Sequence, residues 1–98
     1  MINAKEAKIF SKNINLKNHL LSNLEPQIFH ACNSGLFEVI YPIIYFYEQF
    51  SNKNSFQKFW EIVDKELTKL GYWGYVFKKD FNYYVYLTWR NKSNYEKN

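Results

Sequence analysis

Rings must form much of the hydrophobic core of this chain, because nine Tyr, nine Phe and three Trp make up 21% of its 98 residues. A chain of this length forms a single domain and buries only about 60–65% of its unfolded surface. Hydrophobic residues at 47% and charged residues at 22% are typical of a globular protein and not of a disordered one. AT-rich codons favour Tyr and Phe together with Lys, Asn and Ile, so a functional argument must rest on where the rings lie and not on their number.

The cysteine content and the apolar runs predict a cytoplasmic protein without a membrane segment. Cys32 is the only cysteine, so a disulfide framework is excluded and a reducing compartment is expected. The first six residues lack a secretory signal, and the longest apolar stretch, residues 39–47, is far shorter than the roughly 20 residues of a membrane span. The formal net charge of +4 comes from residues 50–98. Either an acidic partner or a simply solvated surface would explain this excess of basic residues.

Residues 3–24 show the apolar period of an amphipathic helix. Five residues recur at steps of three, four and seven on its expected inner face: Ala7, Phe10, Ile14, Leu21 and Leu24. Pro26 is expected to end this helix, because proline lacks the N–H group and clashes with the preceding turn. A second short helix is predicted for residues 26–33, with Ile28, Ala31 and Cys32 facing inward and Gly35 ending it.

The strongest helical pattern covers residues 55–70 and predicts a helix that packs on a sheet. Asn54 is expected to cap its N-terminus, with Gln57 three residues later, and Gly71 is expected to end it. Its apolar stripe follows successive steps of three or four residues and consists of Phe56, Phe59, Trp60, Val63, Leu67 and Leu70.

Segments with strand character complete the prediction of an α+β domain. Residues 36–41 alternate as a strand does, and extended structure is expected to continue to about Phe46. Residues 72–77 and 82–89 predict a hairpin that turns through residues 78–81. We therefore expect N-terminal helices, a small antiparallel sheet ending in a C-terminal hairpin, and helix 55–70 packed on that sheet. One domain is expected over residues 1–90, followed by a polar tail at residues 91–98.

Pairing Phe77 with Asn82 divides the side chains of the hairpin between two faces. The face with the aliphatic residues suits the helix. The other face, called the aromatic face below, carries Trp73, Tyr75, Phe77, Tyr84 and Tyr86. A slip of one residue in the pairing would exchange the two faces.

Three hypotheses account for the aromatic face. The N-terminal helices cover it, so that it belongs to the core. It is an interface for a second copy or another protein, since Tyr and Trp are favoured there. It is a stacking platform for bases or a nucleotide, with Lys78, Lys79 and Arg90 nearby to bind phosphate.

The sequence contains no recognisable catalytic or metal-binding constellation. Phosphate-binding glycine loops, H-E-x-x-H and C-x-x-C are missing. His30 and Cys32 are two residues apart on a predicted helix, so their side chains point about 200° apart. His19 and His30 lack a third ligand at a suitable spacing. We therefore expect no enzymatic activity, no cofactor and no metal site, and a small buried Cys32.

Four short motifs recur in the same order as in a type of small bacteriophage protein. They are residues 3–7 (Asn-Ala-Lys-Glu-Ala), Ile28-x-x-Ala31-x-x-x-Gly35, Leu67-x-x-Leu70-Gly71-Tyr72, and Tyr86-x-Thr88-Trp89. The chain resembles that type over most of its length, although the phage proteins commonly end in Ile-Ser-Trp where this chain has Leu87-Thr88-Trp89. The matched residues are mainly structural, so the resemblance implies a fold and a phage origin and transfers no active site.

Such an origin implies a protein that acts by binding in the cytoplasm of a host cell. The expected function is inhibition of a host defence system, by binding a host protein or by sequestering a nucleotide signal. The alternatives are a nucleic-acid-binding accessory protein, for which affinity should fall steeply with salt, and a self-associating component of a virion or scaffold.

Overall fold

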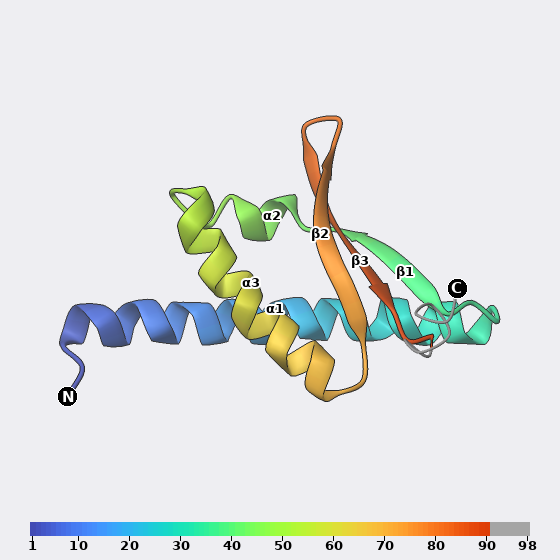
Figure 1. Cartoon of the computed structure of the whole chain (residues 1–98), viewed down its shortest axis with the longest axis horizontal. Coiled ribbons are helices and arrows are strands. Elements are labelled where there is room, and N and C mark those ends of the chain that lie inside the picture. The colour runs from blue at the N-terminus through green and yellow to red at the C-terminus, as the bar shows by residue number, and fades with distance from the viewer. Residues whose placement is uncertain (91–98) are drawn as a thin grey trace, which may run out of the picture.

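Three helices pack on one face of a three-stranded antiparallel sheet in the computed structural model, which describes residues 1–90 (Figure 1). The elements are α1 (Ala4–Asn33), β1 (Glu38–Pro42), α2 (Ile44–Tyr47), α3 (Lys53–Lys69), β2 (Trp73–Lys79) and β3 (Asn82–Thr88). The predicted α+β class and its C-terminal hairpin are confirmed. The predicted tail, residues 91–98, lies outside the described residues.

Helix α1 continues through Pro26, so the prediction of two separate helices is wrong. Asn3 caps the N-terminus of the helix, and its side chain accepts a hydrogen bond from the Glu6 N–H at 2.9 Å. Proline leaves the carbonyl of Ser22 without its helical partner, which is a local cost. Packing outweighs it, because Leu24 and Ala31 are both buried, one on each side of Pro26.

The inner face of α1 agrees with the expected one at Leu24 and Ala31 and departs from it at two other positions. Its buried residues are Asn13, Leu20, Leu24 and Ala31. Phe10 and Cys32, which were expected to face inward, are exposed. Gly35 does end the helical segment, with a positive φ of 76° and the Leu36 N–H donating to the Ala31 carbonyl at 2.9 Å.

The segment after β1 turns into the short helix α2, so the expected extension to Phe46 is wrong. Ile43 donates its N–H to the Tyr83 carbonyl at 2.8 Å, and the helix follows at once. Ile43 and Phe46 are both buried in the core. Residues three apart share a side in a helical turn and not in a strand, so burial of this pair favours the turn.

Helix α3 confirms the apolar stripe of the sequence, with a start that lies two residues earlier than expected. Its N-cap is Asn52, whose side chain accepts from the Ser55 N–H at 2.8 Å, and not Asn54. Phe56 to Leu67 of the stripe are buried, whereas Leu70 is exposed. Gly71 ends the helical segment with a φ of 94°, as expected.

The hairpin turns through Asp80 and Phe81 alone, so its register differs from the expected one by two residues. Both turn residues have positive φ, 51° and 69°, as in the two-residue turns that match the twist of paired strands. Lys79 pairs with Asn82, and Phe77 pairs with Tyr84. A shift of two residues returns every side chain to the same face, so the composition of both predicted faces is kept.

Strand β3 lies at the centre of the sheet, between β1 and β2. Its Val85 and Leu87 are fully buried against the helices. Four rings join the aliphatic residues of this core, as the composition predicts: Phe46, Phe56, Phe59 and Trp60. Figure 1 shows α1 crossing the length of the molecule, with the turn between β2 and β3 projecting beyond the helices.

The continuous helix predicts that Pro26→Ala stabilises the protein. The substitution restores the hydrogen bond to the Ser22 carbonyl, and the free energy of unfolding should rise by about 1–3 kcal/mol. Urea denaturation followed by circular dichroism measures this difference. A neutral or destabilising effect would indicate instead that Pro26 begins a second helix, where proline is favourable.

Candidate functional site

The face of the sheet that points away from the three helices is the candidate site. We call it the outer face; it combines the aromatic face with two residues of β1, Ile40 and Pro42. The N-terminal helices do not cover it, because α1 packs on the opposite side, where Leu20 and Leu24 join Val85 and Leu87 in the core. The hypothesis that α1 buries the aromatic face is therefore wrong.

Exposure follows the strand alternation on the outer face. Tyr75 is 48% exposed, Trp73 is 41% exposed, and Ile40, which pairs with Tyr86, is 59% exposed. The valine and leucine on the other side of β3 have no exposed surface. The outer face is thus an apolar surface over three neighbouring strands, which makes it the candidate interaction surface.

The rings of the outer face pack on one another across the strands. Phe77 and Tyr84 are stacked, with ring centroids 5.5 Å apart. Tyr75 lies tilted at 5.3 Å from Tyr86, and Trp73 meets Tyr86 edge-on at 6.3 Å. Such cross-strand pairs hold each ring in place, so little conformational entropy remains to be lost when a partner binds.

A carboxylate lies at one end of this surface. The hydroxyl of Tyr86 donates a hydrogen bond to the carboxylate of Glu38, which joins the central strand to β1 across the face. Lys79 lies at the other end, where the strands reach the turn. Charge is therefore placed at the ends of the outer face and rings at its centre.

The three basic residues predicted to bind phosphate do not form one patch. Lys78 belongs to the opposite side of the hairpin, with its ammonium group 5.7 Å from the ring of Tyr83. Lys79 is on the outer face at the turn. Arg90 follows the far end of β3 and lies 5.0 Å from the ring of Phe37. The alternation of the strand separates Lys78 from Lys79, and the length of the strand separates both from Arg90.

Phe81 is a further surface residue that the sequence reading did not single out. It occupies the tip of the hairpin, is 89% exposed, and has a φ of 69°. The left-handed region disfavours large side chains, and turns of this type prefer glycine at this position. A phenylalanine following aspartate in a tight turn is the sequence signal that would have identified it.

Metal-ligating side chains do not gather anywhere in residues 1–90. Within that range no group of three or more His, Cys, Asp or Glu side chains could hold a metal ion. Cys32 is exposed, which corrects the expectation of a buried thiol. No helix within the described range is both long and apolar enough to span a membrane.

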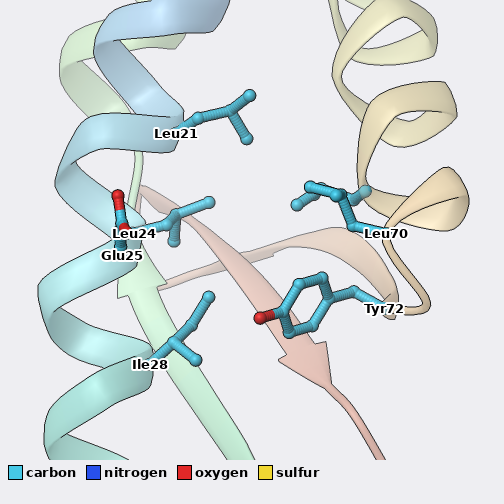
Figure 2. Close-up of a pocket in the computed structure, with 7 residues that line it drawn as sticks. Leu21, Leu24, Glu25, Ile28, Leu70 and Tyr72 are labelled. Atoms are coloured by element: carbon cyan, nitrogen blue, oxygen red, sulfur yellow. The ribbon is translucent and has the colours of Figure 1, made fainter.

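An apolar cleft of about 240 Å³ separates α1 from the end of α3. Figure 2 shows Leu21, Leu24 and Ile28 pointing from α1 towards Leu70 and Tyr72, with the hydroxyl of Tyr72 directed at α1. The lining offers shape and apolar contact, and Glu25 is the charged group beside it.

Comparison with known proteins gives no relative: no protein-family model, no curated protein and no solved structure matches the chain.

The backbone conformation at the tip predicts that Phe81→Gly stabilises the protein. Glycine adopts positive φ without the steric cost that phenylalanine has there, and the gain should be about 0.5–1 kcal/mol after the greater freedom of the unfolded chain is subtracted. Urea denaturation measures the change. Lys79→Gly, in extended backbone two residues away, should lower stability instead, and a gain of similar size in both variants would contradict the prediction.

Proposed function

We propose that this chain is a non-enzymatic binding protein that engages a protein partner through its outer face. The observation that carries the proposal is the uncovered sheet face with its interlocked rings. Tyr75 and Ile40 are about half exposed, whereas Val85 and Leu87 on the other side of the sheet are fully buried. Because such a sheet face exposes apolar surface to water, burying that surface against a partner is favourable.

The shape of the outer face supports a protein partner over a small ligand. Sites for small ligands are concave and enclose most of the ligand. The rings here pack side by side along neighbouring strands, as in the stacked Phe77–Tyr84 pair, and present a broad surface. Tyr and Trp at the centre of such a surface supply large contact areas at low entropic cost, which is typical of binding hot spots.

The charge distribution supports a protein partner over a nucleic acid. A protein that stacks bases on a sheet also needs cations along the path of the phosphates. On the outer face Lys79 stands at one end and the carboxylate of Glu38 at the other, while Lys78 is on the opposite side. An aromatic centre with charge at its ends is the arrangement of a protein interface.

Inhibition of a host defence protein is the finer form of this proposal. Its support is the resemblance of the four sequence motifs to small phage proteins, together with the rigid outer face. Blocking another protein requires a preorganised surface and no catalytic groups, and the interlocked rings of β2 and β3 provide such a surface.

A photo-cross-linker tests the proposal in cells. Benzoylphenylalanine replaces Ile40 on the outer face or, as a matched control, Phe29 on α1, which is also well exposed. We expect one protein to be captured from Ile40 and not from Phe29. Capture of nucleic acid, or of the chain itself, would support the accessory-protein or the self-associating alternative.

With the captured protein purified, Tyr75→Ala should weaken binding by roughly 30-fold or more, the loss expected for a hot-spot ring. Phe29→Ala should leave the affinity unchanged, and thermal melts of both variants confirm that they are folded. Equal losses in the two variants would contradict the proposal. A steep loss of affinity with rising salt would show that charges, and not the rings, supply the binding.

A further inference from the structure

A second cleft lies largely on the side of the hairpin opposite the outer face, and Phe77 of the aromatic face reaches its lining. This cleft of about 410 Å³ opens between α2, the first turns of α3, and strands β2 and β3 near the turn. Tyr47, Lys53, Gln57, Lys78 and Tyr83 contribute the polar groups that line it. Lys53 and Lys78 are 25 positions apart in the sequence, and Tyr47 and Tyr83 are 36 apart. The fold therefore brings these residues together.

A stacked pair of tyrosines forms one wall of the cleft. The rings of Tyr47 and Tyr83 are nearly parallel, with centroids 3.8 Å apart. Its neighbour Tyr83, through side-chain hydrogen bonding, is the first cause that raises the pKa of Tyr47 above its usual value, and burial is the second. The positive charges of Lys53 and Lys78 lower the pKa of Tyr47, because they favour the ionised phenol.

The charge of the cleft is positive. Lys53 begins α3 and Lys78 leans over the ring of Tyr83 at 5.7 Å, and no residue described as lining the cleft is acidic. Two ammonium groups around one cleft match the charge of a phosphate monoester, which is close to −2 at neutral pH. The amide of Gln57 is a further hydrogen-bond donor.

The same cleft has an apolar part. Phe56 and Val76 line it beside the polar groups. Each tyrosine of the pair carries an O–H group that can donate a hydrogen bond to a ligand. Charged, neutral and apolar groups thus converge in one concavity, as they do in sites for small anionic molecules.

We propose that this cleft binds a small-molecule phosphate monoester. Lys53 and Lys78 neutralise the phosphate, Gln57 and one tyrosine hydroxyl donate hydrogen bonds to its oxygens, and the organic part packs against Val76 and Phe56. The proposal goes beyond the protein interface, because Phe77 is the one residue of the aromatic face among those that line the cleft.

Isothermal titration calorimetry with phenyl phosphate, on the full chain at low and at physiological salt, tests the proposal. Saturable binding with one molecule per chain is expected. Phenol should bind much more weakly because it lacks the phosphate, and inorganic phosphate more weakly because it lacks the ring. No saturable binding of phenyl phosphate up to about 10 mM, which corresponds to an affinity too weak for a built site, would overturn the proposal.

Matched lysine variants locate the binding. Lys53→Gln and Lys78→Gln should each weaken phenyl phosphate binding about tenfold, the range of a charge-assisted hydrogen bond. Lys58→Gln on α3 and Lys79→Gln on β2 change the same charge on the same elements outside the cleft. All four lysines are exposed, so the variants should fold. Equal losses in all four variants would show a diffuse charge effect and would overturn the assignment of the site.

Discussion

The burial of Val85 and Leu87 against the helices is the interaction on which the rest of the structure depends. Both side chains are fully buried, and both belong to β3, the central strand of the sheet. Because side chains alternate along a strand, burying this pair inward turns Tyr84 and Tyr86 outward. The pairing of β1 and β2 with β3 then places Ile40 and Tyr75 beside them.

The positions of the helices leave the outer face of the sheet uncovered. Helix α1 covers the inner side over a long path because it does not stop at Pro26, and α3 packs beside it with its row of buried rings. With both long helices on one side, the described part of the chain has no further helix to place on the other. The outer face is therefore a consequence of core packing, and its aromatic composition is what suggests a function. The tip of the hairpin projects beyond this packed region (Figure 1).

Short-range patterns in the sequence predict the elements whose stability is decided locally or by one repeated contact. The stripe from Phe56 to Leu67, the glycine at position 71 and the alternation of the hairpin all follow from period and from backbone freedom. The five rings of the aromatic face are predicted for the same reason, since even the wrong register, shifted by two residues, keeps them together.

Features decided by tertiary contact could not be predicted in this way. Local chemistry ends a helix at Pro26, and only the joint burial of Leu24 and Ala31 shows why α1 continues. The side of the sheet that α1 covers depends on contacts between residues far apart in sequence. The same is true of the cleft that joins Tyr47 and Lys53 to Lys78, because nothing in the local sequence relates α2 to the hairpin.

The central claim is that the two faces of the sheet differ in their access to solvent. Paramagnetic relaxation by a soluble gadolinium chelate measures this difference directly on the methyl groups of Ile40 and Val85, which point to opposite sides of adjacent strands. We expect strong relaxation of the Ile40 methyl signals and almost none for Val85. Equal protection of the two residues would show that the outer face is covered and would contradict its role as a binding surface.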